Sequence, residues 1–245
     1  MANESSISVI IPTYDESNSI RPLLILIDDV MGPSLKEIIV IDDSSRDGTD
    51  RIVMDLARAN QKIVFISRPR KLGLSSAVFK GSDVSQGNIV CVMDGDLSHD
   101  PEEIPTMLNR IAEGFDIVIG SRYAPGGTIT NLPIRRRLIS KLLNYVARTL
   151  FGLSPNDVLS GFVMCRKTVF DSMPTRYSSP GFKFLLELLV TNRGYRVSEI
   201  PITFRDRQGG KSKATSKEGL ELFLLAVQLS VWKLKMKVGL PYRER

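Results

Sequence analysis

The chain has 245 residues, of which 42% are hydrophobic and 24% are charged, which is enough to bury a full core within one domain. It contains no run of about eighteen uncharged apolar residues, and residues 1–6 are polar, so the sequence predicts neither a membrane-spanning helix nor a signal peptide. Its two cysteines, Cys91 and Cys165, lie in apolar runs without metal-ligand spacing, which favours reduced, packed thiols in a cytosolic protein.

The formal net charge is +6, and the excess of positive charge is concentrated in a few segments. These segments are 68–71, 135–141, 211–217 and 233–237. A basic surface suits nucleic acid, anionic lipid or a phosphorylated substrate. Nucleic-acid binding is disfavoured because aromatic residues make up only 7% of the chain and are sparse among the basic ones.

Strand-like and helix-like segments alternate through the first half of the chain. Short β-branched runs predict strands at 6–11, 37–41, 62–66, 88–93 and 116–120. Helical patterns between them predict helices near 19–30, 48–59, 75–84 and 101–112. The last helix has Asp100 as a candidate N-cap and Pro101 in its first turn. This alternation predicts an α/β fold with a doubly wound, mostly parallel sheet flanked by helices.

The second half is less regular. Its predicted elements are a basic helix at about 134–151, a strand at 161–165, an apolar helix at 182–192, a strand at 196–204 and a loop at 208–213. An apolar helix at 218–232, followed by Lys233, Lys235 and Lys237, has two interpretations. It packs on the core, or it lies in a membrane interface, where each basic residue near the headgroups contributes about 1 kcal/mol.

Two carboxylates, Asp94 and Asp96, directly follow the apolar run 88–93. Such a run is typical of a strand buried on both faces, and ligands bind at the carboxyl edge of open α/β sheets. Carboxylates at that edge favour a divalent cation that also holds phosphate oxygens, whereas capping of a turn is the simpler alternative. His99, the one histidine in the sequence, is expected in a solvent-facing loop rather than as a catalytic base.

The ends of the first two predicted strands narrow the class of ligand. No glycine follows the first strand in the run 12–16, which disfavours a dinucleotide-binding turn, and no GxxxxGK[ST] motif exists, which excludes a P-loop. The second strand ends in Asp42 and Asp43. Either carboxylate can accept hydrogen bonds from a ribose or base, or serve as a helix cap and turn residue.

Eight segments of the chain occur in an order typical of one enzyme family. They are IIPTYDES, IIVIDDSSRDGT, KLGLSSA, VMDGDLSHDPEEIP, GSRYAPGG, DVLSGFVMCRK, GFKF and IPITFRDRQGGKSK. Together they resemble the inverting, nucleotide-sugar-dependent glycosyltransferases of family 2, which have the GT-A fold, and in particular the dolichol-phosphate mannose synthase group. The resemblance extends from residue 7 to about residue 213.

The resemblance implies a nucleotide-sugar site and a metal site. The nucleotide-sugar residues would be Pro12, Tyr14, Glu16, Ile41, Asp43, Asp94, Gly95, Asp96, Lys183, Arg207 and Lys213. Mg²⁺ or Mn²⁺ would bind Asp94 and Asp96, with Ser98 as a weaker ligand where some members have Gln. The family usually has Asn at the position of Asp15, so this chain carries an additional negative charge there.

The resemblance also implies a site for an acceptor phosphate, formed by Arg122, Arg136, Ser140 and Arg207, and gives catalytic functions to Asp94, Asp96, Arg122 and Arg207. Arg136 and Ser140 are four residues apart and therefore share one helix face. A solvated helix face is the alternative interpretation of residues 135–137. A lipid monophosphate is already an anion at neutral pH, so no dedicated general base is expected.

The activity implied is transfer of mannose from GDP-mannose to dolichyl or another polyprenyl phosphate, with UDP-glucose as donor or a non-lipid acceptor as alternatives. One GT-A domain would comprise a nucleotide-sugar half at about 1–122, an acceptor half at about 123–215 and a C-terminal helix at about 216–238. The QxxRW motif of processive family 2 synthases is absent, which disfavours that class.

The resemblance also implies a location on the cytoplasmic side of a membrane, the endoplasmic reticulum if eukaryotic or the cell membrane if prokaryotic. The protein would bind this membrane peripherally or through a small membrane subunit.

Overall fold

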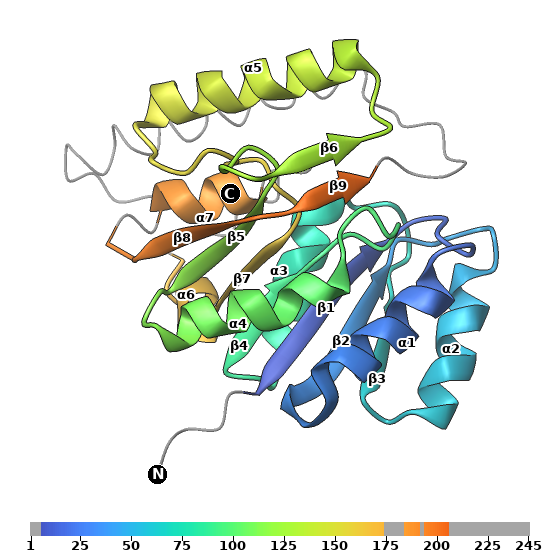
Figure 1. The fold of residues 1–245 in the computed structure, drawn as a ribbon. Coiled ribbons are helices and arrows are strands. Elements are labelled where there is room, and N and C mark those ends of the chain that lie inside the picture. Colours follow the sequence, from blue (N-terminus) through green and yellow to red (C-terminus); the bar gives the residue numbers. More distant parts are fainter. Residues whose placement is uncertain (1–5, 174–183, 192–193, 206–245) are drawn as a thin grey trace, which may run out of the picture.

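A computed structural model describes residues 6–173, 184–191 and 194–205 of the chain (Figure 1). Its centre is a seven-stranded sheet with the strand order β3-β2-β1-β4-β7-β5-β8. The strands are β1 (Ile7–Thr13), β2 (Leu35–Asp42), β3 (Ile63–Ser67), β4 (Ile89–Val92), β5 (Ile117–Ser121), β7 (Val163–Arg166) and β8 (Val197–Pro201). All neighbouring pairs are parallel except those of β7, which is antiparallel to both β4 and β5.

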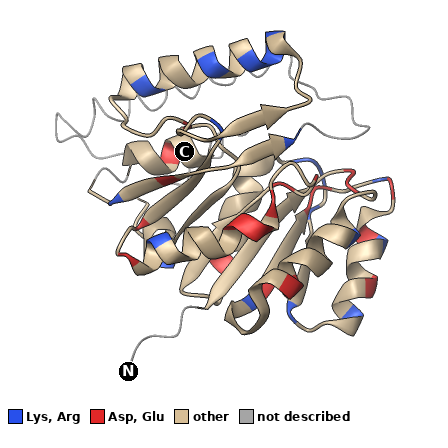
Figure 2. Cartoon of the chain, in the orientation of Figure 1, with Lys and Arg blue, Asp and Glu red and all other residues tan. Residues whose placement is uncertain are grey.

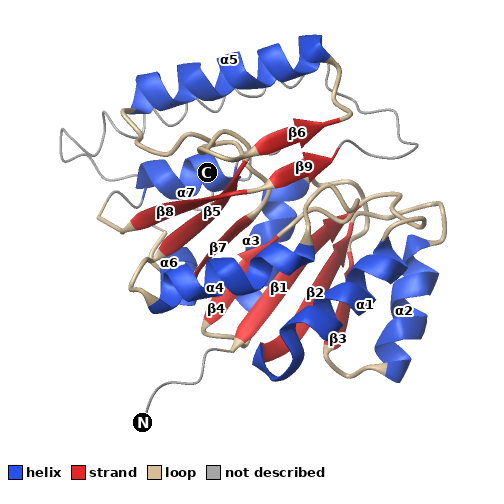
Figure 3. Cartoon of the chain, in the orientation of Figure 1, coloured by secondary structure: helices blue, strands red, loops and turns tan. Residues whose placement is uncertain are grey.

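Helices cover both faces of this sheet (Figure 3). One face packs against α1 (Ile20–Met31), α2 (Thr49–Ala59) and α4 (Ile104–Ala112), and the other against α3 (Leu74–Val84), α6 (Lys167–Asp171) and α7 (Phe184–Thr191). Short 3₁₀ helices, η1 (Gly32–Ser34) and η2 (Pro101–Glu103), precede β2 and α4. Successive residues of a strand point to opposite faces, so β1 and β2 need continuous apolar runs to fill both cores. The predicted doubly wound sheet is confirmed.

The parallel strands bring their carboxyl ends to one edge of the sheet. The loops after β1, β2, β4 and β5 therefore lie near one another, although long helical segments separate them in the sequence. The antiparallel β7 runs the other way and begins at this edge, where Val163 pairs with Val92 and with Ile119. The residues that precede β7 consequently lie beside the ends of β4 and β5.

Most predicted elements are confirmed, and one is wrong in a way that matters for the site. Residues 196–204 do not form one strand, because β8 ends at Pro201 and β9 (Thr203–Arg205) pairs with β6 (Thr128–Thr130) in a separate two-stranded sheet. Ile202 connects the two sheets, because its N–H donates to the carbonyl of Ser121 in β5 and its own carbonyl accepts from the N–H of Thr128 in β6. The side chain of Asp100 caps η2 as predicted, accepting from the N–H of Glu102 at 3.1 Å.

The helix α5 (Ile134–Phe151) lies outside the main sheet, above the β6–β9 pair in Figure 1. Only part of its surface joins the core, chiefly through Ala147 and Phe151. In the part of the chain that the structure describes, no helix is both long enough and apolar enough to cross a bilayer. The predicted loop at 208–213 and helix at 218–232 lie outside the described residues. Both cysteines are buried in strands, and burial raises the pKa of each thiol.

Candidate functional site

The two carboxylates of the Asp-Gly-Asp motif emerge from the carboxyl end of β4, as predicted. Acidic segments gather in the loops at this end of the sheet (Figure 2). The carbonyl of Gly95 accepts a 2.8 Å hydrogen bond from the hydroxyl of Ser19, which precedes α1. A Cβ at position 95 would lie 3.2 Å from Cγ2 of Thr13, so the backbone between the carboxylates packs closely against β1. The loop is therefore held on one side by β1 and by the residue before α1.

The residues after Gly95 form a tight, strained turn. Asp96 Oδ1 accepts from the N–H of Ser98 at 3.0 Å, and Leu97 has a φ of 61°, a conformation that branched apolar residues rarely adopt. The hydroxyl of Ser98 is buried and has no hydrogen-bond partner among the described residues. A buried polar atom without a partner calls for an explanation, and a ligand is one.

This donor set fits a divalent cation. Carboxylate and hydroxyl oxygens are the hard ligands that Mg²⁺ and Mn²⁺ prefer. The described residues contain no group of three or more His, Cys, Asp or Glu side chains placed to hold a metal ion. An ion on Asp94 and Asp96 would consequently need further oxygens, which the phosphates of a bound nucleotide can supply.

The expectation that His99 faces solvent is wrong. Its side chain is only 2% exposed, because its ring stacks on Phe162 at 5.2 Å and meets the edge of Phe204 at 5.6 Å. Its Nδ1 accepts from the backbone N–H of Asp94 at 3.3 Å. Burial lowers the pKa of His99 to about 4, although nearby Asp96 opposes this shift, so the imidazole is neutral at neutral pH. His99 is therefore a buried side chain that supports the acidic loop through its hydrogen bond with the backbone of Asp94.

The segment before β7 contacts the loop that carries Asp94 and Asp96. A Cβ on Gly161 would lie 2.9 Å from Oδ2 and 3.1 Å from Oδ1 of Asp94, so this carboxylate rests against the bare backbone of Gly161. Since β7 lies between β4 and β5, the contact joins the motif to the second half of the chain. A residue larger than glycine at position 161 would displace the carboxylate.

Arg122 follows β5 and is held by a buried partner that the sequence did not reveal. Its Nε and Nη2 donate to the two carboxylate oxygens of Asp157 at 2.7 and 2.8 Å, and its backbone N–H donates to the same side chain at 3.1 Å. Burial alone would lower the pKa of Arg122, but the paired carboxylate raises it, and Asp94 acts in the same direction. The guanidinium is therefore charged, fixed in place and part of one electrostatic cluster with the acidic loop.

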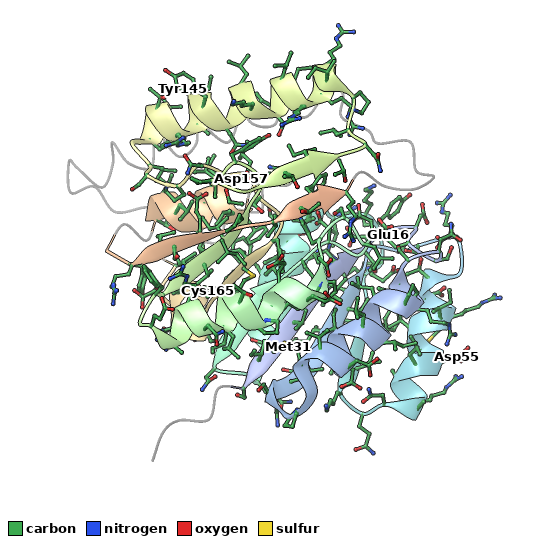
Figure 4. All side chains as sticks on the ribbon, in the orientation of Figure 1. Glu16, Met31, Asp55, Tyr145, Asp157 and Cys165 are labelled. Carbon is green, nitrogen blue, oxygen red and sulfur yellow. The ribbon has the colours of Figure 1, made fainter. Side chains whose placement is uncertain are left out.

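Asp157 is in turn fixed by Glu199 of β8. The carboxylate of Glu199 accepts from the backbone N–H of Asp157 at 3.0 Å and from the backbone and side-chain nitrogens of Asn156 at 2.8 and 3.0 Å. Figure 4 shows Asp157 between α5 and the main sheet. Asp157 belongs to the DVLSG segment, one of the eight family motifs. Its partner Arg122 is 35 residues earlier in the sequence, so the spacing of the motif does not predict this ion pair.

The predicted phosphate-binding face of α5 contacts the loop after β5, which also carries Arg122. The hydroxyl of Tyr123 donates to Oγ of Ser140 at 2.9 Å, which ties the helix to the loop after β5. Arg136 is one turn earlier on the same face and is half-buried. Arg135 and Arg137 are exposed, so the alternative of a solvated helix face describes these two residues.

The loop after β1 carries the predicted nucleobase and ribose residues. Tyr14 lies beneath Lys71, whose Nζ is 3.5 Å from the ring centroid. Glu16 is half-buried, and its N–H donates to Oγ1 of Thr49 at the start of α2. Asp15 has a φ of 59°, which Asp and Asn tolerate, and its carboxylate accepts from the N–H of Arg46 at 2.8 Å. The loop is thus braced against the segment after β2.

The residues at the end of β2 are engaged within the protein. Asp43 is buried, forms an ion pair with Arg68 and accepts from the N–H groups of Leu72 and Gly73 at 3.1 and 3.0 Å. The side chain of Ile41 is fully buried in the core, so the structure does not bring it to the surface with Pro12 and Tyr14. Asp42 accepts from the backbone N–H of Ser45, which is the turn function considered for it.

Three predicted ligand residues, Lys183, Arg207 and Lys213, lie outside the described residues. Arg205, two residues before Arg207, is described and contacts the acidic loop. The N–H of Arg205 in β9 donates to the carbonyl of Ser98 at 3.1 Å, and its Nη1 is 3.5 Å from Oδ2 of Asp100. β9 therefore lies directly beside the turn that follows Asp96.

The model of the family described as glycosyl transferase family 2 matches residues 8–173. A dolichol-phosphate mannosyltransferase from Pyrococcus furiosus is 38% identical over 228 residues, which cover 92% of this chain and 64% of the relative. A polyprenol monophosphomannose synthase from Mycolicibacterium smegmatis is 38% identical over 84% of this chain and 79% of its own length. A dolichol-phosphate mannosyltransferase from Saccharomyces cerevisiae is 36% identical over 92% and 87%. The chain thus spans slightly less than two thirds of the Pyrococcus relative.

Solved structures with a similar fold include glucosyl-3-phosphoglycerate synthase from Mycobacterium tuberculosis. Its complex with UDP superposes with a TM-score of 0.68 at 19% identity, covering 97% of this chain and 82% of that one. Its complex with Mn²⁺, UDP and glucosyl-3-phosphoglycerate gives a TM-score of 0.66, also at 19% identity. At this identity the likeness is one of fold.

Proposed function

Because the chain belongs to glycosyl transferase family 2, we propose that it transfers mannose from GDP-mannose to dolichyl or another polyprenyl phosphate with inversion at the sugar. Three relatives that are 36% to 38% identical are named for dolichol-phosphate or polyprenol-phosphate mannosyl transfer, which supports this substrate class. The observation that carries the proposal is the electrostatic cluster at the sheet edge, where the fixed guanidinium of Arg122 interacts with the charge of Asp94, and where both Arg122 and Asp96 act on His99.

On the donor side, Asp94 and Asp96 would hold a Mg²⁺ or Mn²⁺ ion, with Ser98 as a weaker ligand. Bound there, the ion would neutralise charge on the departing nucleoside diphosphate. Pro12, Tyr14, Glu16, Asp43 and the backbone near Ile41 would line the nucleoside site in the half formed by residues 1–122. Lys183, Arg207 and Lys213 are proposed as further donor contacts.

On the acceptor side, Arg122 is preorganised. Its Nε and Nη2 are fixed by Asp157, and Nη1 is outside this pair and can donate to an anion. Arg136, Ser140 and Arg207 would complete the phosphate site in the half formed by residues 123–215. A preorganised cation requires no reorganisation when the anionic acceptor binds, which favours its alignment with the sugar.

The proposed reaction needs no general base. A polyprenyl phosphate carries its nucleophilic oxygen as an anion at neutral pH, so no proton must be removed before attack. His99 is unsuited to that task because its ring is enclosed by Phe162 and Phe204, and its Nδ1 is engaged by the N–H of Asp94. Its contribution is to support the acidic loop.

The decisive experiment supplies radiolabelled GDP-mannose, dolichyl phosphate and Mn²⁺ and measures label in the organic phase. Metal-dependent label there supports the proposal, and a complete absence of label with GDP- and UDP-sugars alike contradicts it. A thermal-shift series compares donors, because a ligand of the native state raises stability by RT ln(1 + [L]/Kd). Greater protection by UDP-glucose would favour the alternative donor, and label confined to a protein or glycan would favour a non-lipid acceptor.

The proposed acceptor is a lipid, so the reaction would take place at a membrane surface. We propose peripheral association on the cytoplasmic side of the endoplasmic reticulum or cell membrane, either direct or through a small membrane subunit. Sedimentation of the protein alone with lipid vesicles distinguishes these routes, because a subunit-dependent enzyme remains in the supernatant.

A further inference from the structure

Tyr123 connects two of the residues proposed to hold the acceptor phosphate. Arg122 and Tyr123 belong to the loop after β5, whereas Ser140 lies on α5. The hydroxyl of Tyr123 donates to Oγ of Ser140 at 2.9 Å, and the guanidinium carbon of Arg122 lies 5.3 Å from the centroid of the Tyr123 ring. One side chain therefore contacts a cation from one element and a hydroxyl from another.

The backbone of Tyr123 is fixed independently of these two contacts. The buried hydroxyl of Ser121 accepts from the N–H groups of Tyr123 and Ala124 at 3.3 and 2.9 Å. The N–H of Gly127 donates to the carbonyl of Ala124 at 2.8 Å, which closes a turn. A Cβ on Gly127 would lie 2.7 Å from the carbonyl oxygen of Ser121, so the loop returns closely to its own start. The side chain of Tyr123 therefore extends from a compact, hydrogen-bonded loop.

The position of Ser140 on α5 gives the contact with Tyr123 its importance. The buried residues of α5 all lie in the second half of the helix and are Asn144, Ala147 and Phe151. Arg136 and Ser140 lie in the first half, which is less deeply packed. The hydrogen bond from Tyr123 therefore helps to set where this half of the helix lies relative to Arg122.

The direction of the hydrogen bond determines what Ser140 can donate to. A serine hydroxyl has one hydrogen to donate and two lone pairs that accept. Because Oγ of Ser140 accepts from Tyr123, its own hydrogen is directed to a different partner, and a phosphate oxygen is a strong acceptor for it. If Ser140 donated to Tyr123 instead, only its lone pairs would remain to face the anion.

We propose that Tyr123 is a positioning residue of the acceptor-phosphate site. Its hydroxyl orients the hydroxyl of Ser140 so that this group donates to the phosphate, and its ring limits the movement of the Arg122 guanidinium. The inference rests on the proposed function, because it concerns the acceptor of that reaction. Tyr123 acts through these two neighbours and need not touch the substrate itself.

Tyr123→Phe tests the hydroxyl while keeping the ring. We expect kcat/KM for a polyprenyl phosphate acceptor to fall about fivefold, because a neutral hydrogen bond is worth about that factor. Thermal protection by GDP-mannose with Mn²⁺ should be unchanged, since the contacts of Tyr123 with Arg122 and Ser140 are on the acceptor side. A parallel loss of donor protection would indicate a merely structural function and overturn the proposal.

The matched control removes the hydroxyl of a similar pair at a distant position. Tyr195 precedes β8, at the edge of the sheet opposite to the acidic loop, and its hydroxyl is 3.0 Å from Oγ of Ser172. Urea unfolding of Tyr195→Phe measures what the loss of such a hydrogen bond costs in stability, and transfer by this variant should be unchanged. Equal kinetics of Tyr195→Phe and Tyr123→Phe would overturn the proposal.

A double-mutant cycle tests whether the hydroxyl of Tyr123 acts through Ser140. Ser140→Ala should lower kcat/KM for the acceptor at least about tenfold, because it removes a hydrogen bond to a charged group. The double variant, Tyr123→Phe with Ser140→Ala, should be no worse than Ser140→Ala alone. Losses that multiply to about fiftyfold would show that the two hydroxyls act separately and would overturn the proposal.

Tyr123→Leu removes the ring as well as the hydroxyl. Its kcat/KM should fall at least about fivefold below that of Tyr123→Phe, because a cation–π contact is lost and Arg122 gains freedom. Equal activity of these two variants would overturn the part of the proposal that concerns Arg122. If the unmodified protein transfers no sugar to polyprenyl phosphate, the proposed function fails and this inference fails with it. If the unmodified protein transfers sugar and Tyr123→Phe has the same kcat/KM, only the inference fails.

Discussion

Replacing Asp157 with asparagine tests whether the guanidinium of Arg122 must be held in place. The aspartate side chain is fully buried and receives three N–H groups of Arg122, whose own side chain is 14% exposed. Removing one partner of a buried ion pair costs about 3–5 kcal/mol. Asparagine keeps one carbonyl acceptor, and water reaches the edge of Arg122, so we expect a loss of about 2–3 kcal/mol in the free energy of unfolding.

The same substitution should impair the reaction more than donor binding. A displaced Arg122 no longer presents its charge to the acceptor phosphate, and loss of one preorganised donor lowers turnover by about 10²-fold. The free energy is measured by urea unfolding, and kcat/KM by organic-phase extraction of labelled lipid. Protection by GDP-mannose with Mn²⁺ should persist in Asp157→Asn, because the acidic loop is intact. This separation would not appear if the variant were merely unstable.

The control for Asp157→Asn is Asp55→Asn, whose ion pair with Arg58 is exposed on both sides and should contribute about 0–1 kcal/mol. A loss of less than about 0.5 kcal/mol in Asp157→Asn, with transfer within about twofold of the unmodified protein, would show that Asp157 is not needed to hold Arg122. A parallel fall of donor protection and transfer would contradict a specific role on the acceptor side.

Three further predictions concern the acidic loop and its surroundings. Asp96→Ala should abolish both transfer and Mn²⁺-dependent thermal protection by nucleotide sugar; retained turnover would refute the proposed metal site. Gly161→Ala should lower transfer at least about tenfold, since its Cβ would lie 2.9 Å from Oδ2 of Asp94, and unaltered kinetics would show that this carboxylate has another position in the active enzyme. Hydrogen bonds from Thr49 and Ser17 outweigh burial and lower the pKa of Asp47 from 3.8 to about 2, so its contribution to stability is complete above pH 3.8 and lost toward pH 2. The stability difference between the unmodified protein and Asp47→Asn, followed by urea unfolding, should therefore shrink as pH falls through this window; a constant difference contradicts the assignment.

Much of the fold could be predicted because its first half obeys local rules. Buried parallel strands need continuous apolar runs, and the helices between them need a 3.6-residue period, so the alternation of the two patterns predicts a doubly wound sheet. The carboxyl edge of such a sheet is a fixed place, which is why Asp94 and Asp96 were predicted correctly at the end of β4. The family match and the relatives confirm the resemblance drawn from the eight motifs.

The remaining features depend on contacts that no local pattern encodes. His99 lies in a loop as predicted, but it does not face solvent, because Phe162 and Phe204 enclose it from segments far along the chain. The strand predicted at 196–204 divides because Ile202 bonds to two different strands. For α5 the period predicted the helix, whereas the direction of its apolar side follows only from where Tyr123 holds Ser140.

The position of β7 explains how the two halves of the chain share one site. In a wholly parallel sheet, the strand beside β4 would end at the edge that carries Asp94 and Asp96. The residues that precede that strand would then lie at the opposite edge. Because β7 is antiparallel, Gly161 and Phe162, which precede it, contact Asp94 and His99, and Asp157 lies close enough to hold Arg122. One reversed strand thus places a carboxylate pair from the first half against a guanidinium fixed by the second. Any substitution that shifts the start of β7 should therefore perturb both sides of the proposed reaction together.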